Sequence, residues 1–351
     1  MLRPTITIGD HKVGPGHPAF IVAEISANHL QSLDRCLEII NAAKEAGANA
    51  IKTQTYTADT LTIDCDKEPF LIKDGAWQGR RLYDLYQEAY TPWDWHERMQ
   101  EEAEKLGLIF FSTPFDITAV DYLEKLQVPL YKIASFECVD IGLLTRVAQT
   151  RKPVILSTGM ATMAEIEEAV STLEQGGCEQ VALLKCTSAY PAKPEDMNLR
   201  TISHMAQTFG VPAGLSDHTL TTAVPVASVA QGAAIIEKHF TISRDENGPD
   251  SFFSLNPEEF SQMVTDVRTV ERALGVINYG PTNTEKDSVV FRRSLFVVED
   301  ISQGELFTEK NVRSIRPGDG LHPRYLRHVL GRKAAHAIER GTPFSWDLIG
   351  A

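Results

Sequence analysis

Lysines stand near the ends of four separate short apolar segments in this sequence. They are Lys52 in NAIKTQT, Lys132 in LYKIAS, Lys185 in VALLKCTS and Lys238 in AAIIEKHF. Lysine is seldom buried without a partner, so a lysine at the tip of an apolar strand needs an anion nearby. If the four tips meet at one mouth, their charges suit a phosphate or a carboxylate, with serine and threonine hydroxyls adding neutral hydrogen bonds. For any single lysine, a structural ion pair with Glu24, Glu137 or Glu237 is an equally good interpretation.

Two histidines, His218 and His239, end the last two of these apolar segments. Two imidazoles at neighbouring strand tips could hold one divalent ion and leave coordination positions open for water and substrate. Such openness suits a catalytic ion, whereas a structural site is closed by four protein ligands. A hydrogen-bonded core histidine, or a general acid or base without metal, remains the alternative.

These tips must be positioned by a repeating framework, because short apolar segments alternate with longer amphipathic ones from residue 20 to about 275. The eight apolar segments are FIVAEI (20–25), NAIKTQT (49–55), LIFFSTP (108–114), LYKIAS (130–135), PVILSTG (153–159), VALLKCTS (181–188), VPAGLSD (211–217) and AAIIEKHF (233–240). Eight strand–helix units in about 255 residues predict an α/β fold of the (β/α)8 TIM-barrel type, in which strand ends form the floor of the active site. A doubly wound open sheet is the alternative, but no GxGxxG motif follows the first strand.

Two of the intervening segments predict helices with particular clarity. In residues 33–47, apolar side chains recur at helical spacing and Gly47 ends the pattern. In residues 256–275, Asn256 is a plausible cap, Pro257 fits the first turn, and one apolar face follows. That face comprises Phe260, Met263, Val267, Val270 and Leu274. Residues 57–90 form a long insertion after the second strand, and insertions of this kind often form lids or substrate walls.

Composition limits the class of protein. The chain has 351 residues, 43% of them hydrophobic and 23% charged, with a net charge of −13. A large acidic globular protein of this kind is a poor partner for nucleic acid or an anionic membrane. Five cysteines lack CxxC spacing, which favours free thiols in a reducing compartment. They are Cys36, Cys65, Cys138, Cys178 and Cys186. With no signal peptide and no apolar segment of 18 residues, we expect a cytoplasmic protein.

The alternation ends near Gly275, which predicts a domain boundary. We expect a barrel over residues 1–275, a linker over 276–288 that contains NYGPTNTEKDS, and a small β-rich domain over 289–351. A domain of about 60 residues buries only a small core by itself, so we expect it to pack against the barrel or against a second subunit. Its motif RPGDGLHP (316–323) indicates a tight turn, with Arg316 at its start.

Nine motifs in order resemble the sialic acid synthases. They are AEISANH (23–29), IKTQT (51–55), FSTPFD (111–116), YKIAS (131–135), ILSTGM (155–160), LKCTSAYP (184–191), GLSDHT (214–219), EKHF (237–240) and GPDSFFSL (248–255). The C-terminal segment with RPGDGLHP resembles the antifreeze-like, β-clip SAF domain of that family. Within the family, Ser26-Ala27 and the segment WQGRRLYDLYQEAYTPWDWH (77–96) are most similar to the pseudaminic acid synthase branch.

The resemblance implies a reaction and its participants. Phosphoenolpyruvate condenses with an open-chain amino-sugar aldehyde, and C–O cleavage releases inorganic phosphate. For the pseudaminate branch the sugar is 2,4-diacetamido-2,4,6-trideoxy-altrose. The alternatives are N-acetylneuraminate or legionaminate synthases, which use N-acetylmannosamine or a 2,4-diacetamido-trideoxy-mannose. The cofactor implied is one Mn²⁺ or Mg²⁺ per active site, and the assembly implied is a domain-swapped homodimer.

The resemblance also implies site residues, each taken from the matching motif. Phosphoenolpyruvate would be held by Lys52, Thr113, Lys132, Ser135, Ser157, Ser188 and Ser216, and Gln54 is also assigned to substrate binding. His218 and His239 would bind the metal. The residues expected to face the sugar or move protons are Glu24, Glu137, Tyr190 and Asp250. Arg316 would reach the N-acetyl group of the sugar from a partner's SAF domain. Lys185 occupies a variable family position and receives no role.

Three other functions are open from the residues. A Schiff-base aldolase would use Lys132 or another strand-end lysine with a depressed pKa. An ice-binding or sugar-binding protein is suggested by the antifreeze-like domain, although that segment carries charged residues throughout instead of regular threonines. A metal-dependent hydrolase lacks support, because neither HxH nor HExxH occurs.

Overall fold

The computed structural model describes residues 2–246 and 248–350. The chain divides into two compact units, Met1–Gly275 and Val276–Ala351.

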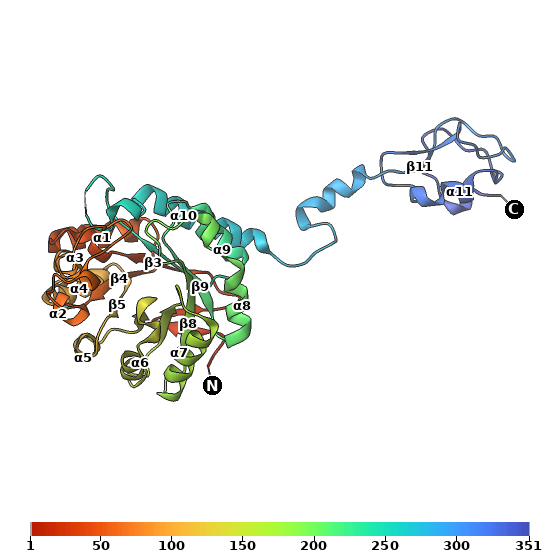
Figure 1. Ribbon diagram of the computed structural model, residues 1–351. Coiled ribbons are helices and arrows are strands. Elements are labelled where there is room, and N and C mark those ends of the chain that lie inside the picture. The colour runs from red at the N-terminus through yellow and green to blue at the C-terminus, as the bar shows by residue number, and fades with distance from the viewer. Residues whose placement is uncertain (1, 247, 351) are drawn as a thin grey trace. The chain divides into compact units, whose positions relative to one another are not determined.

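The first unit is built on a closed barrel of eight parallel strands (Figure 1). The strands are β3 (Phe20–Glu24), β4 (Ala50–Thr55), β5 (Ile109–Pro114), β6 (Tyr131–Ile133), β7 (Val154–Ser157), β8 (Val181–Cys186), β9 (Ala213–Asp217) and β10 (Ile235–His239). They pair in sequence order, and β10 closes the barrel against β3. The predicted (β/α)8 barrel, with each strand at its predicted place, is confirmed.

Each strand is buried on both faces, which explains why the segments are apolar throughout instead of alternating. On β3, Phe20 and Val22 belong to a core of strand residues that fills the barrel interior. Ile21 and Ala23, between them, pack in the layer under the helices. Alternate residues along each strand therefore face inward and outward, and this alternation decides which tip residues reach the mouth of the barrel.

A helix after each strand covers the outside of the barrel, and α4 follows β4 only after the 57–90 insertion (Figure 1). The helices are α1 (Leu33–Glu45), α4 (His96–Lys105), α5 (Ile117–Lys125), α6 (Ile141–Ala148), α7 (Met163–Gln175), α8 (Arg200–Phe209), α9 (Ala223–Ala230) and α10 (Pro257–Leu274). Asn256 caps α10 as predicted, with its side chain accepting from the backbone N–H of Glu259. The predicted apolar face of α10 is wrong at its end, because Leu274 is 52% exposed in the last turn.

Two additions complete the first unit. A hairpin of β1 (Ile6–Ile8) and β2 (His11–Val13), which sequence reasoning missed, packs its apolar side chains onto the interior core of the barrel. The 57–90 insertion forms α2 (Ala58–Leu61), α3 (Leu82–Ala89) and a β-bridge between Leu71 and Arg81.

The second unit has its own small apolar core. It contains the antiparallel strands β11 (Ser294–Val297) and β12 (Val312–Ile315) and the short helix α11 (Leu326–Val329). Phe307 and Phe344 pack edge to face within this core, with ring centroids 4.8 Å apart. A 3₁₀ helix, Asn283–Phe291, spans the boundary placed at residue 288. Within the described part of the chain, no helix is long and apolar enough to cross a membrane.

Candidate active site

The carboxyl ends of the barrel strands surround a cavity with about 400 Å³ of empty space, part of it open to solvent. The strand register places the strand ends at the same height, since Glu24 lies opposite both Lys52 on β4 and His239 on β10. The cavity is lined by Glu24, Lys52, Gln54, Thr113, Phe115, Lys132, Ala134, Ser135, Phe136, Ser157, Cys186, Tyr190, Ser216, His218, Glu237 and His239. Side chains from all eight strands or the loops that follow them therefore share one chamber.

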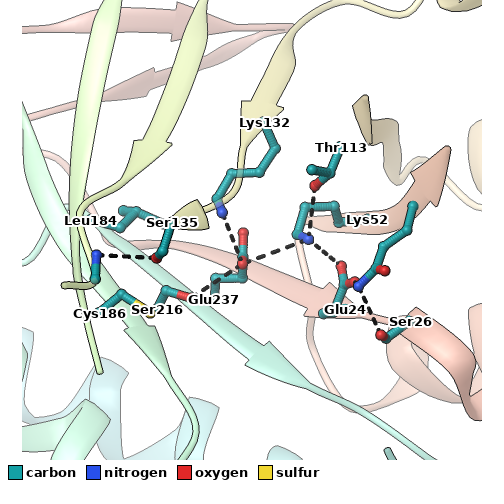
Figure 2. Close-up of polar contacts among 12 residues, drawn as sticks. Glu24, Ser26, Lys52, Thr113, Lys132, Ser135, Leu184, Cys186, Ser216 and Glu237 are labelled. Atoms are coloured by element: carbon teal, nitrogen blue, oxygen red, sulfur yellow. Dashed lines mark hydrogen bonds and ion pairs between the residues drawn. The ribbon is translucent and has the colours of Figure 1, made fainter. Parts of the chain in front are cut away.

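A chain of alternating charges crosses the floor of this cavity (Figure 2). Lys52 Nζ lies 2.5 Å from Glu24 Oε2 and 3.7 Å from Glu237 Oε1. Lys132 Nζ lies 3.4 Å from the same Glu237 oxygen. All four side chains are buried. Two cations and two anions balance here, and the second oxygen of Glu237 has no hydrogen-bond partner among the described residues.

Burial and pairing act against each other on these charges. Burial disfavours the charged form of Lys52, but the carboxylates of Glu237 and Glu24 outweigh it and raise the pKa of that amine. At Lys132 burial prevails over the attraction of Glu237, and its pKa is lowered. Burial raises the pKa of Glu24 despite Lys52. Strong pKa perturbation by burial and specific partners, inside a cavity, is typical of functional sites.

Hydroxyls and an amide complete the polar lining. Thr113 Oγ1 accepts from Lys52 Nζ at 3.2 Å, and Gln54 Nε2 donates to Glu24 Oε1 at 3.0 Å. Ser216 Oγ donates to Glu237 Oε1 at 3.3 Å. Ser157 Oγ is buried without a hydrogen-bond partner among the described residues. Hydroxyls of this kind are available to the oxygens of a bound anion.

Gly159, in the loop after β7, explains how two serines approach the cavity together. Its backbone N–H donates to Ser135 Oγ at 3.1 Å. A Cβ at this position would lie 2.4 Å from Ser188 Oγ and 2.8 Å from Ser135 Oγ, so a side chain would displace both serines. Ser188 itself is partly buried and lies beside the cavity lining instead of within it.

His218 and His239 face one another with ring centroids 5.3 Å apart. Nδ1 of His218 donates to the backbone oxygen of Thr187 at 2.9 Å. Burial disfavours the charged form of His218, but Cys186 and the Thr187 carbonyl outweigh it and raise the pKa of this imidazole. Nδ1 of His239 is buried without a hydrogen-bond partner among the described residues. Burial and the neighbouring His218 lower the pKa of His239 well below its usual range, so this imidazole is neutral, as a metal ligand must be.

The donor set fits an open catalytic ion and not a closed structural one. Within the described residues, no group of three or more histidine, cysteine, aspartate or glutamate side chains could enclose a metal. Two facing imidazoles would leave most coordination positions of a bound divalent ion to water and substrate oxygens.

The expectation that four lysines converge is wrong for two of them. Lys238 lies on the outer side of β10, where its Nζ pairs with Asp217 Oδ2 at 2.5 Å and donates to the backbone oxygen of Thr219. Lys185 donates to the backbone oxygen of Cys186 at 2.6 Å and does not line the cavity. Only Lys52 and Lys132 among the four face inward. Glu237 and Lys238 do not pair with each other, because adjacent strand residues point to opposite faces.

The remaining predicted residues lie at different distances from this chamber. Tyr190 lines it, with its ring 4.5 Å from that of His218. Asp250 is buried nearby and accepts hydrogen bonds from the Ser26 hydroxyl and the Ala27 N–H. Burial raises the pKa of Glu137, beside the cavity, to about 7. Arg316 is exposed in the second unit, directly after β12.

Sequence reasoning gave Glu237 only a possible structural ion pair and gave Cys186 no role, although both line the cavity. Glu237 is the centre of the charge chain, and its position two residues before His239 on one strand places both on the same face. Cys186 lines the cavity with Sγ 4.0 Å from His218 Nδ1. Its place on β8, two residues after the inward-facing Leu184, is the only pattern that indicates this orientation.

Two protein-family models match the sequence of this chain. A model of the NeuB family matches residues 39–279, and a model of the SAF domain matches residues 292–350. The chain belongs to the NeuB family. The resemblance to the sialic acid synthases, and the barrel followed by a SAF domain, are confirmed.

Individual relatives and a solved structure cover most of the chain. A pseudaminic acid synthase from Helicobacter pylori is 44% identical over 334 residues, which cover 95% of this chain and 98% of that protein. An N,N'-diacetyllegionaminic acid synthase from Legionella pneumophila is 34% identical and covers 96% of each chain. The crystal structure of an N-acetylneuraminic acid synthetase from Leptospira borgpetersenii is 33% identical, with a TM-score of 0.73, covering 82% of this chain and 96% of that one.

Proposed function

We propose that this protein condenses phosphoenolpyruvate with open-chain 2,4-diacetamido-2,4,6-trideoxy-altrose to give pseudaminic acid and inorganic phosphate. The observation that carries the proposal is the presence of two inward lysines and two facing histidines in one cavity. These residues occur in a chain 44% identical to a pseudaminic acid synthase and only 34% identical to a legionaminic acid synthase.

Lys52 and Lys132 hold the phosphate and carboxylate of phosphoenolpyruvate. Both ammonium groups are buried, so their attraction for an anion is screened far less than at a surface. Thr113, Ser135, Ser157 and Ser216, together with Ser188, add neutral hydrogen bonds around the same anion. As C–O cleavage releases phosphate, the lysines stabilise the charge that develops on the leaving group.

Glu24 orients water for the second half of the reaction. Attack of C3 of phosphoenolpyruvate on the aldehyde carbon forms the C–C bond and leaves cationic character at C2. Water adds to C2, and a carboxylate within reach accepts its proton before phosphate departs. Glu24 suits this role because burial raises its pKa while Lys52 and Gln54 fix its orientation.

His218 and His239 would hold the Mn²⁺ or Mg²⁺, which when bound supplies Lewis-acid polarisation of the aldehyde oxygen. The hydrogen bond from His218 Nδ1 to the Thr187 carbonyl fixes that ring for the task. Tyr190, Glu137 and Asp250 face the sugar and move its protons.

Arg316 completes the site from a second copy of the chain, in a domain-swapped homodimer. Mixing two inactive proteins tests this arrangement, one carrying Arg316→Ala and the other His239→Ala. In a swapped dimer, one of the two sites in the mixed species carries both native residues. We expect recovery of about a quarter of wild-type activity. No recovery after verified subunit exchange would rule out a partner's Arg316.

Phosphate release from phosphoenolpyruvate with each candidate sugar tests the reaction itself. We expect release with the trideoxy-altrose derivative and Mn²⁺, abolition by a chelator, and a pseudaminic acid mass for the product. Faster release with N-acetylmannosamine or the mannose-configured diacetamido sugar would assign the sialate or legionaminate alternative. A borohydride-trapped adduct on Lys132 would instead favour the aldolase chemistry.

A further inference from the structure

Ser26 lies in the loop after β3, beside Glu24 at one end of the charge chain (Figure 2). Its backbone adopts a conformation that serine seldom takes, because its φ is +48°, in the left-handed region that favours glycine. The side chain is buried. Strain of this kind persists only where surrounding contacts hold the residue in place, and it is concentrated at functional sites. The contacts of the Ser26 hydroxyl are therefore the place to look for a role.

The Ser26 hydroxyl gives its proton to Asp250. Oγ of Ser26 donates to Oδ2 of Asp250, and the N–H of Ala27 donates to the same carboxylate oxygen at 3.2 Å. Because an ionised carboxylate only accepts hydrogen bonds, the proton of this hydroxyl is committed to Asp250. Toward any other neighbour, Ser26 Oγ can then act only as an acceptor.

Gln54 is that other neighbour, and it lines the cavity. Its Nε2 donates to Ser26 Oγ at 2.8 Å and to Glu24 Oε1 at 3.0 Å. A reversed amide would place the carbonyl oxygen of Gln54 against a carboxylate oxygen and against a hydroxyl whose proton is already donated. Ser26 and Glu24 thus fix the amide in one orientation. Both of its N–H groups face protein, so its carbonyl Oε1 is the group available to a ligand.

Two hydrogen-bond acceptors therefore lie side by side at this part of the cavity, the Glu24 carboxylate and the Gln54 carbonyl. A sugar hydroxyl or an amide N–H offers one proton to such a pair, whereas a water molecule offers two. Under the proposed function, Glu24 orients the water that adds to C2 of phosphoenolpyruvate. The second O–H of that water matches the Gln54 carbonyl, which leaves a lone pair of the water oxygen directed at C2.

We propose that Ser26 is a positioning residue for the attacking water and that it acts through Gln54. This inference rests on the proposed function, because it assumes that water adds to C2 beside Glu24. The water oxygen bonds to C2, one of its protons passes to Glu24, and the other stays hydrogen-bonded to Gln54 Oε1 during the attack. Without the Ser26 hydroxyl, the Gln54 amide keeps only one of its two anchors, and its carbonyl loses its fixed direction.

Single-turnover phosphate release measures this effect without interference from product release. The full-length enzyme, in excess over phosphoenolpyruvate, is mixed with Mn²⁺ and the amino-sugar aldehyde that supports turnover. Ser26→Ala should lower the rate of the chemical step about tenfold, the effect of one well-oriented hydrogen bond. In the steady state, KM for each substrate should stay within about twofold of wild type, because Gln54 contacts the water and not the substrates.

Two further variants test whether the hydroxyl acts, and whether it acts through Gln54. In a Gln54→Ala background, adding Ser26→Ala should lower the rate by less than about twofold, because the group that Ser26 positions is already absent. Ser26→Gly should show the same loss of about tenfold as Ser26→Ala. Its Tm should be higher than that of Ser26→Ala, since glycine adopts a φ of +48° without strain. A role for the backbone alone would separate the rates of these two variants instead.

Ser254→Ala is the matched control, because Ser254 is another buried serine with two hydrogen bonds between the same two loops. Its hydroxyl donates to the backbone oxygen of Asp250 at 2.7 Å and accepts from Asn28 Nδ2 at 2.9 Å. Neither bond involves Gln54. The single-turnover rate of this variant should therefore stay within about twofold of wild type, whatever its loss of stability.

A Ser26→Ala rate within about twofold of wild type would overturn the inference, as would an undiminished loss in the Gln54→Ala background. A rise confined to KM for the sugar would also overturn it, because the Gln54 carbonyl would then contact the sugar. So would a crystal structure of Ser26→Ala with the Gln54 amide unchanged, a result that needs no turnover. The proposed function fails by a different result, the absence of phosphate release by the wild-type protein with every amino-sugar aldehyde.

Discussion

Glu237 and Lys238 are neighbours on β10, yet they belong to two buried ion-pair clusters of opposite character. Glu237 faces the barrel interior and meets Lys52 and Lys132 at 3.7 and 3.4 Å. Lys238 faces the helix layer and meets Asp217 at 2.5 Å. Both clusters are buried pairs of lysine and carboxylate at the same depth along the strands. They differ in which side of the sheet they occupy.

The outer cluster is complete. Besides pairing with Lys238, Asp217 accepts from the N–H of Thr219 at 3.0 Å and from its hydroxyl at 3.1 Å. The inner cluster leaves one oxygen of Glu237 and the hydroxyl of Ser157 without partners among the described residues, and it borders a cavity. A saturated buried pair stabilises one conformation, whereas an unsaturated one retains capacity to bind a ligand. This distinction is open to mutation.

Lys132→Met should have the largest effect, and on activity. The change removes a charge that the proposed reaction places on the phosphate, so kcat/KM for phosphoenolpyruvate should fall about 10²–10³-fold. Thermal unfolding should shift little, since Glu237 keeps Lys52 as a partner. Steady-state phosphate release and a melting curve measure both quantities. A large loss of Tm with activity retained in the folded fraction would show that the inner cluster is structural, contrary to the comparison.

Lys238→Met should do the opposite. It leaves the Asp217 carboxylate buried without its cation, which typically costs about 3 kcal/mol in the free energy of unfolding. The kcat/KM of the folded protein should stay within about threefold of wild type, because Lys238 does not line the cavity. Denaturant unfolding measures the loss. Adding Asp217→Leu should recover part of it, since the pair is then replaced as a unit.

The barrel can be predicted from the sequence because the eight apolar segments and their spacing do not depend on how individual side chains pack. It does not allow the inward and outward faces to be told apart by hydrophobicity, because both are buried and apolar. Lys52 and Lys132 lie two residues after the interior residues Ala50 and Leu130. Lys185 is one residue after interior Leu184. An offset of one residue moves a lysine from the cavity to the opposite face of the strand. The offset can be read only when the interior residues of the barrel are known.

The packing of Trp77 could not be predicted from the sequence. Trp77 belongs to the 57–90 insertion, whose fold has no repeating pattern, and its ring contacts are with residues more than 100 positions away. A long insertion after a barrel strand predicts a substrate wall in general terms. Where the Trp77 ring packs depends on tertiary contacts such as the hydrogen bond to Pro249.

Glu137→Gln tests the comparison through pH, because Glu137 is a half-buried carboxyl outside both clusters. Burial raises its pKa from 4.5 to about 7, although Lys132 acts in the opposite direction. The folded state thus binds this proton more tightly than the unfolded state, and the stability gained below pH 4.5 is lost as the pH rises through 7. The variant should be more stable than wild type by about 1–2 kcal/mol at pH 8 and equal to it at pH 4. Unfolding at the two pH values measures this. A difference of the same size at both would rule out titration of Glu137 as the cause.

Lys185→Ala should have the smallest effect of all, and it tests the comparison most directly. Lys185 is a strand-tip lysine like Lys52, but its Nζ donates to the backbone oxygen of Cys186 at 2.6 Å and to Thr187 Oγ1 at 3.2 Å. Both acceptors can turn to water when the amine is removed, because this side chain is only partly buried. Stability should change by less than about 1 kcal/mol, and kcat/KM by less than about twofold. Phosphate-release kinetics at saturating metal provide the measurement. A tenfold loss would mean that a third lysine reaches the substrate, and the side of the strand would then no longer separate catalytic from structural charges.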